Sequence, residues 1–175
     1  RINKLVEELL LLTKNEGEGS LLNEYINLND EITSRLDSLD KVHPDYTFEA
    51  KLEQGRVMYP INNYHFEQML IIFLDNAIKF DTENKHITVS SETADDGSIE
   101  IQITDSGIGI PKEEIDQVFN RFYRVDKSRS RDQGGNGLGL SIAKKIVELY
   151  RGTVWISSTE GESTTVHIKF PKPKK

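Results

Sequence analysis

Gly134-Gly135-Asn136-Gly137-Leu138-Gly139-Leu140 holds four of the chain's twelve glycines and runs directly into a helical pattern expected over about 138–150. A glycine-rich loop that opens a helix exposes unpaired backbone N–H groups at the positive end of the helix dipole, which makes an anion site. No Lys-Ser or Lys-Thr follows the last glycine, and Leu140 breaks the dinucleotide pattern G-x-G-x-x-G. Taken alone, the stretch is equally compatible with a tight turn at the start of a helix.

Composition narrows the class of protein. The 175 residues suit one domain, or one domain with a helical appendage. A net charge of −7 argues against a nucleic-acid surface, so we expect no nucleic-acid partner. The chain has no cysteine and therefore no disulfide framework or thiolate metal site. Its longest apolar run, Met69 to Leu74, is too short to span a bilayer.

The rest of the chain shows helix and strand patterns in an irregular order, which predicts a mixed sheet covered by helices on one face. Tyr46–Leu52 and Val57–Tyr59 look like a hairpin turning at Gly55, and Asn29 or Asp30 is the expected N-cap of a helix that ends before Pro44. Asn62 or Asn63 is the expected cap of a longer helix reaching about Phe80, and Pro111 is expected to start a short one. Further strands are expected over 25–28, 87–91, 99–104, 153–157 and 165–170.

The first residues differ from the rest. Residues 1–16 carry an apolar seam typical of a coiled coil, although a core helix of the same domain is also compatible with so short a repeat. Residues 17–23 contain Gly17 and Gly19 and are expected to be a linker. The main domain is expected over 24–171, with a basic tail at 172–175. Because the chain begins at Arg1 rather than Met, we expect it to be a piece of a longer protein.

Two polar sites stand out in this pattern. Asn76 and Lys79 interrupt an otherwise apolar helix, where the amide is either satisfied by neighbouring backbone or serves as an oxygen ligand for Mg²⁺. Asp105 follows a predicted strand and precedes Gly107 and Gly109. This is either a plain turn or the floor of a pocket, where a carboxylate would accept from the exocyclic amine of adenine.

The segment before the glycine-rich stretch is basic and aromatic. Its cations suit either a solvated face or phosphate contact, and its aromatic side chains could hold a loop that closes over a ligand. The cations are Arg121, Arg124, Lys127, Arg129 and Arg131, and the aromatic residues are Phe119, Phe122 and Tyr123.

The order of these motifs resembles the nucleotide-binding fold shared by gyrase-type topoisomerases, heat-shock chaperones, histidine kinases and mismatch-repair ATPases. Residues 119–124 (FNRFYR) are similar to the F box of sensor histidine kinases, and 74–80 (LDNAIKF) to their N box. Residues 105–111 and 134–140 are similar to their two G boxes, and Gly161 with Thr164-Thr165 completes the series. The details are closest to a kinase type of Gram-positive cocci.

The resemblance implies an α/β two-layer sandwich: a mixed, mostly antiparallel sheet covered on one face by three helices, with a mobile ATP lid over about 119–137. It implies ATP and Mg²⁺ as cofactors, and Asn76, Lys79 and Arg124 as catalytic residues. Asn76 would be the metal ligand, and Lys79 and Arg124 would meet phosphates. Asp105 would bind the adenine amine, with Phe80 beside the base. The remaining implied contacts to the nucleotide are Gly107, Gly109, Ile110, Phe119, Tyr123, Gly135, Gly137, Leu138, Gly139, Leu140 and Thr164.

Two departures from the family pattern bear on function. Position 72 is Ile, where histidine kinases often have Asn and the hydrolysing relatives have a Glu that activates water; Ile72 cannot act as a base. None of His43, His65, His86 and His167 lies in an H-E/D-x-x-x-P stretch, so the acceptor histidine is expected upstream.

We therefore expect the cytoplasmic catalytic domain of a membrane sensor kinase. It would transfer the γ-phosphoryl group of ATP to a histidine of its own dimerisation domain, which residues 1–16 would end, for relay to the receiver domain of a response regulator. The full-length protein would be a homodimer and the 175-residue fragment monomeric. A same-fold ATPase and a nucleotide-sensing module without turnover are the alternatives.

Overall fold

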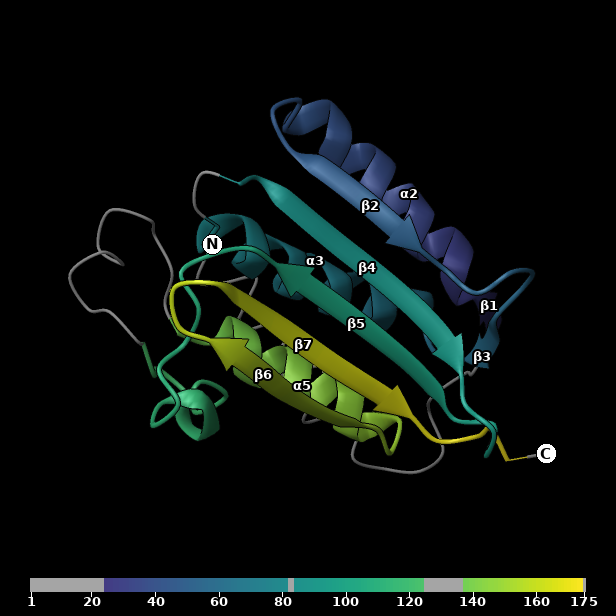
Figure 1. The fold of residues 1–175 in the computed structure, drawn as a ribbon. Coiled ribbons are helices and arrows are strands. Elements are labelled where there is room, and N and C mark those ends of the chain that lie inside the picture. The colour runs from purple at the N-terminus through teal and green to yellow at the C-terminus, as the bar shows by residue number, and fades with distance from the viewer. Residues whose placement is uncertain (1–23, 82–83, 125–136, 175) are drawn as a thin grey trace.

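The computed structural model describes residues 24–81, 84–124 and 137–174, and Figure 1 shows a sheet with its helices on one face. The helices of these described residues are α2 (Leu28–Val42), α3 (Asn63–Lys79) and α5 (Gly139–Leu149), with a 3-10 turn η1 (Ile115–Gln117). The strands are β1 (Tyr25–Asn27), β2 (Thr47–Lys51), β3 (Met58–Pro60), β4 (His86–Thr93), β5 (Ile99–Asp105), β6 (Thr153–Thr159) and β7 (Ser163–Phe170). The two-layer α/β sandwich predicted from the sequence is confirmed.

The main sheet has the strand order β2-β4-β5-β7-β6, and β1 pairs separately with β3. All pairs are antiparallel except β2 with β4, which is parallel. The hairpin expected between Tyr46–Leu52 and Val57–Tyr59 is therefore wrong. The first of these segments joins β4 with Phe48 opposite Ile87, and the second joins β1 with Tyr59 opposite Ile26.

The core lies between the sheet and α3, whose surface is apolar over most of its circumference. Such a helix must be covered by protein on several sides. The structure packs α3 on one face of the sheet, with α2 on one side of it and α5 on the other. Its buried apolar side chains are Phe66, Met69, Leu70, Phe73, Leu74 and Ala77. The predicted Asn62 cap is confirmed, since the side chain of Asn62 accepts from the backbone N–H of His65 at 3.2 Å.

The N-cap predicted for α2 is wrong. The helix begins at Leu28 with Asn27 in the N-cap position, so it starts earlier in the chain than the predicted caps Asn29 and Asp30. Asn29 is buried instead and joins two segments. Its amide nitrogen donates to the carbonyl of Glu53 at 2.8 Å, and its amide oxygen accepts from the Ser91 hydroxyl at 2.7 Å. These hydrogen bonds satisfy the amide of Asn29, which would otherwise be costly to bury.

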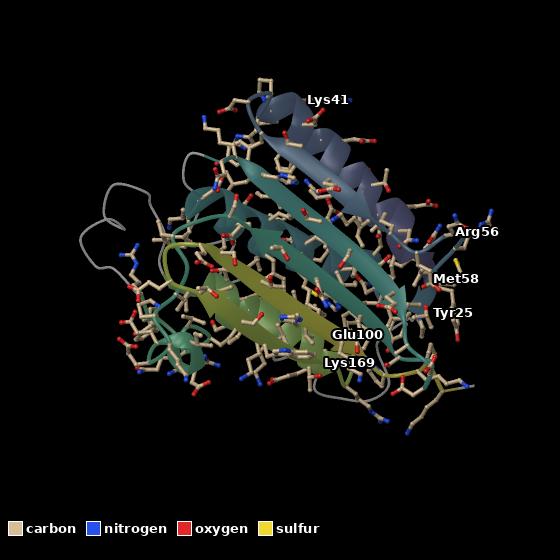
Figure 2. The ribbon with its side chains drawn as sticks, in the orientation of Figure 1. Tyr25, Lys41, Arg56, Met58, Glu100 and Lys169 are labelled. Atoms are coloured by element: carbon tan, nitrogen blue, oxygen red, sulfur yellow. The ribbon has the colours of Figure 1, made fainter. Side chains whose placement is uncertain are left out.

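The second face of the sheet carries polar side chains. Glu100 on β5 and Lys169 on β7 form an ion pair there at 3.6 Å, and Figure 2 shows the two side chains together on neighbouring strands. The short helix expected to start at Pro111 is wrong. A turn follows Pro111, and the only helical residues of this segment are the 3-10 turn η1. The helix and linker predicted over 1–16 and 17–23 lie outside the described residues. None of the described helices is long and apolar enough to cross a bilayer.

Candidate functional site

Asp105 lies at the end of β5, in the sheet's interior, and its side chain is buried. The backbone N–H of Gly107 donates to its Oδ1 at 2.9 Å. Burial raises the pKa of Asp105 to about 6, the Gly107 N–H opposes that rise, and the negative charge of Asp81 adds to it. A carboxylate in these surroundings is a strong acceptor for a donor that arrives from outside the protein.

The loop that follows β5 has glycine at positions 107 and 109 because other backbone segments approach it closely there. A Cβ added at Gly107 would lie 2.2 Å from the carbonyl oxygen of Phe80 and 2.8 Å from Oδ1 of Asp105. Gly109 has φ +71°, and a Cβ there would lie 2.4 Å from the carbonyl oxygen of Thr159. The loop is thus pressed between the end of α3 and the turn that joins β6 to β7, and no side chain fills the space beside Asp105 from these positions.

Thr164 completes this end of the sheet. It lies directly opposite Asp105 on the neighbouring strand and is buried. Its hydroxyl shares a hydrogen bond with the Ser158 hydroxyl at 2.8 Å, and Ser158 also accepts from the backbone N–H of Ile110 at 2.8 Å. Two of the predicted residues, Thr164 and Ile110, are therefore joined through Ser158, which the sequence patterns did not single out.

The C-terminal end of α3 brings the other predicted polar residues to the same loop. The backbone N–H of Ile108 donates to the carbonyl of Phe80 at 3.1 Å, which ties the loop to this helix end. Asn76 is half-buried one turn earlier, and the Lys79 ammonium lies 5.5 Å from the centre of the Phe80 ring. Burial lowers the pKa of Lys79, and the positive charge of Arg124 lowers it further. Two cations that repel each other in this way favour an anion between them.

The two ends of the predicted lid, as far as the structure describes them, contact each other. Phe122 adopts φ +63° with an exposed ring, and its N–H donates to the carbonyl of Gly137 at 2.9 Å. Gly137 has φ +75°, and a Cβ there would lie 2.8 Å from the backbone of Phe122. Phe119 and Tyr123 pack against the core, and Lys144 of α5 lies over the Phe119 ring at 5.7 Å. Gly135 lies outside the described residues.

Helix α5 begins at Gly139, and its N-cap residue Leu138 has an apolar side chain that makes no cap hydrogen bond. A Cβ added at Gly139 would point toward Ile72 of α3, 3.5 Å from its Cγ2. The first turn of α5 therefore faces α3 one turn before Asn76, and its N–H groups supply donors of the kind that hold phosphates. Leu138, Leu140 and Ile110 pack partly against the core, so their side chains also support the fold.

The donor set fits a nucleotide with one divalent cation better than a metal held by protein alone. Within the described residues, no group of three or more His, Cys, Asp and Glu side chains could hold a metal ion. Mg²⁺ in such a site takes one or two protein oxygens and completes its shell with phosphate and water. The half-buried amide of Asn76, one helical turn after Ile72 and close in sequence to Lys79, fits that arrangement.

Comparison with known proteins agrees with this geometry. Residues 62–174 match the family described as Histidine kinase-, DNA gyrase B-, and HSP90-like ATPase. The chain is 53% identical over 172 residues to a "Signal transduction histidine-protein kinase ArlS" of Staphylococcus epidermidis, and 51% identical over 171 residues to one of Staphylococcus aureus. These alignments cover 98% and 97% of this chain but 38% of each relative. The predicted likeness to a kinase type of Gram-positive cocci is confirmed.

Solved structures share this fold. A mycobacterial sensor histidine kinase, MprB, has 27% identity and a TM-score of 0.73, covering 87% of this chain and 99% of that one. Full-length ShkA in complex with AMPPNP has a TM-score of 0.75 and covers 98% of this chain and 36% of that one. At 17% identity, the second shows the fold alone.

Proposed function

This chain belongs to the histidine kinase-, DNA gyrase B- and HSP90-like ATPase family, and we propose that it is the ATP-binding catalytic domain of a sensor histidine kinase. The observation that carries the proposal is the contact between the loop after the buried Asp105 and the end of α3, where the Ile108 N–H donates to the carbonyl of Phe80, the residue next to Lys79. Lys79 is in turn close enough to Arg124 for that cation to lower its pKa. One end of this site suits a base with an amino group, and the other suits a chain of phosphates. The 53% identity to a histidine-protein kinase names the reaction class.

We propose the following division of roles within the site. Asp105 accepts from the exocyclic amine of adenine, because the Gly107 N–H occupies Oδ1 and leaves Oδ2 for the ligand. Phe80 lies beside the base, and Lys79, Arg124 and the first turn of α5 hold the phosphates. Asn76 is the protein ligand of Mg²⁺, which neutralises charge on the transferring phosphate. Gly107 and Gly109 keep the wall of the pocket free of side chains.

The reaction that follows is phosphoryl transfer rather than hydrolysis. The bond between the γ-phosphorus and the bridging oxygen of the β-phosphate breaks, ADP departs with that electron pair, and a bond forms between phosphorus and an imidazole nitrogen of the acceptor. Hydrolysis needs a group that takes a proton from water. Ile72 lies against Gly139 where the hydrolysing relatives have such a group, and its aliphatic side chain cannot supply it.

The proposed kinase function also implies an acceptor for the phosphoryl group and two protein partners. We propose that the acceptor histidine belongs to the protein's own dimerisation domain, which residues 1–16 would end, and that the phosphoryl group passes to an aspartate of a response regulator receiver domain. The full-length protein would be a membrane-anchored homodimer with this domain on the cytoplasmic side. Residues 24–171 would then be the catalytic unit and 17–23 the linker to the dimerisation domain.

The test uses γ-labelled ATP with the 175-residue chain, alone and with a separately produced dimerisation domain that carries an acceptor histidine. We expect no label on the chain itself, slow release of inorganic phosphate, and acid-labile label on the added domain, because phosphohistidine is hydrolysed by acid. Transfer should be weak without the covalent tether, which normally supplies the effective concentration. Acid-stable label on the chain, or rapid phosphate release, would contradict the proposal.

A further inference from the structure

Ser158, Thr164 and Asp105 form a row across three neighbouring strands at one end of the sheet. Thr164 on β7 lies directly opposite Ser158 on β6 and, on its other side, directly opposite Asp105 on β5. Residues that lie opposite each other on antiparallel strands share a face of the sheet, with Cβ atoms about 4.5–5.5 Å apart. Thr164 therefore lies beside the carboxylate that we assign to the base. Both side chains keep some exposure, 9% for Thr164 and 8% for Asp105.

The Ser158 hydroxyl has three hydrogen-bond partners. It donates to the carbonyl of Ser163 at 2.8 Å, accepts from the backbone N–H of Ile110 at 2.8 Å, and lies 2.8 Å from the hydroxyl of Thr164. A serine hydroxyl has one hydrogen and two acceptor lone pairs. Because the Ser163 carbonyl can only accept, the hydrogen of Ser158 is used there. The bond between the two hydroxyls therefore takes the hydrogen of Thr164.

This arrangement fixes what Thr164 offers to a ligand. A hydroxyl that donates its one hydrogen to Ser158 has none left for Asp105, and it faces every other neighbour with a lone pair. In the described part of the chain, the Asp105 carboxylate accepts from the Gly107 N–H, and Thr164 is not among its donors. The two side chains therefore present acceptors, and no donor, to a group that approaches this end of the sheet.

We propose that Ser158 is a positioning residue for base selection, which takes the hydrogen of Thr164 and so keeps the base end of the site free of hydroxyl donors. An exocyclic amino group can donate to such a site. The oxo group that replaces it in hypoxanthine has no hydrogen to share, and it would meet two acceptors. Ser158 acts through Thr164 rather than by touching the base. The inference rests on the proposed function, because it explains how the adenine end of that same site rejects other purines.

The test compares ATP with inosine 5′-triphosphate, which carries an oxo group in place of the 6-amino group, by calorimetry in the presence of Mg²⁺. In Ser158→Ala the Thr164 hydroxyl loses its acceptor and becomes free to donate to the oxo group. We expect the preference for ATP over the inosine nucleotide to shrink by about fivefold to tenfold. Loosening of the loop at Ile110 would weaken both nucleotides alike and leave this ratio unchanged, so the ratio separates positioning from a structural role.

Two further single variants define the effect. Ser158→Thr keeps the hydroxyl on a side chain that suits a strand, and it should retain the preference for ATP. Ser157→Ala is the matched control: its hydroxyl lies on the opposite face of β6 and bonds the His167 ring at 2.7 Å, so its removal should leave the preference as it is. Ser158→Cys keeps the size of the side chain but forms only weak hydrogen bonds. It should also reduce the preference, and it answers the same question if alanine prevents folding.

A double variant tests whether Ser158 acts through Thr164. Thr164→Val removes the hydroxyl, and adding Ser158→Ala to it should change the preference no further. An undiminished preference in Ser158→Ala and Ser158→Cys, or an equal further loss in the Thr164→Val background, would overturn the inference while leaving the proposed function intact. An unchanged chain that binds both nucleotides equally would overturn the adenine assignment of Asp105 together with the inference. If the unchanged chain binds neither, the proposed function itself is wrong and the inference fails with it.

Discussion

Replacing Gly139 by Ala should separate the stability of this domain from its ability to hold phosphates. Gly139 is the first residue of α5, and its φ lies outside the left-handed region that favours glycine. The added methyl group would lie 3.5 Å from Cγ2 of Ile72, which is an ordinary van der Waals contact. The folded chain can therefore accept the methyl group without moving, but the space between α5 and α3 becomes smaller.

The stability effect follows from backbone freedom. Glycine in a helix is less favourable than alanine by roughly 0.5–1 kcal/mol, because it loses more conformational freedom on folding. Gly139→Ala should raise the free energy of unfolding by about that amount. For a chain of this size, the change corresponds to a rise of about 1–4 °C in the unfolding temperature. Thermal unfolding without nucleotide measures it.

The binding effect has the opposite sign. The methyl group points toward α3 one turn before Asn76, which is where we place the triphosphate. We expect the affinity for ATP to fall at least about tenfold, or 1.4 kcal/mol, while the affinity for adenosine stays the same. Calorimetry with both ligands in the presence of Mg²⁺ measures the two constants. Adenosine serves as the internal control, since it reaches the base pocket without entering the phosphate end.

Gly137→Ala is the contrasting variant. At φ +75°, with a Cβ only 2.8 Å from the Phe122 backbone, alanine at this position is both strained and crowded. It should lower the free energy of unfolding by about 1–2 kcal/mol, unlike Gly139→Ala. If Gly139→Ala binds ATP as tightly as the unchanged chain, the assignment of phosphates to the start of α5 is refuted. A lower unfolding temperature would contradict the stability argument instead.

Three further outcomes are expected. Asn76→Ala should retain the unfolding temperature but lose at least about tenfold in Mg-dependent ATP affinity; a calorimetric titration that shows the same Mg²⁺ dependence in both chains would contradict the metal assignment. Because the pKa of Asp105 is about 6, ATP affinity should fall as the pH is lowered from 7 to 5 and the carboxylate gains a proton. Asp105→Asn should show weak binding without that pH dependence, and a parallel slope in both chains would refute the assignment. Burial lowers the pKa of His65, whose ring nitrogen bonds the Tyr150 hydroxyl at 2.6 Å. Stability from this group is therefore present above pH 6.5 and lost as the pH falls, because the unfolded chain takes up the proton more readily. Urea unfolding of His65→Gln should lack this acid-sensitive component, and an equal loss in both chains would show that other groups cause it.

Local patterns predicted the helices and the order of the site motifs well. The nearly continuous apolar surface of α3 is buried as expected, and Asn62 caps that helix. Helix periodicity and capping depend on neighbours within a few residues, so the chain's local sequence contains the information. The contacts of the glycines at 107, 109 and 137 with Phe80, Thr159 and Phe122 depend on residues distant in the sequence, and only the structure shows them.

Which strands pair could not be predicted from local sequence patterns. Tyr46–Leu52 and Val57–Tyr59 read as a hairpin because Gly55 separates two alternating segments, yet they enter different sheets. Pairing of β2 with β4 brings together residues about 40 positions apart, and no local signal specifies which strand lies beside which. The register is chosen by the joint burial of both strands' apolar faces against the same helices.

The sequence by itself determined that this chain has the nucleotide-binding fold of the family, where its acidic and glycine motifs lie, and that Ile72 offers no base. Only the tertiary structure decided that Asn29 joins the loop after β2 to strand β4 rather than capping a helix, and that Ser158 links Thr164 to Ile110. The physical reason is that hydrogen bonding and desolvation depend on which groups surround a side chain in space. Those groups come from segments far apart in the sequence, and folding alone brings them within bonding distance.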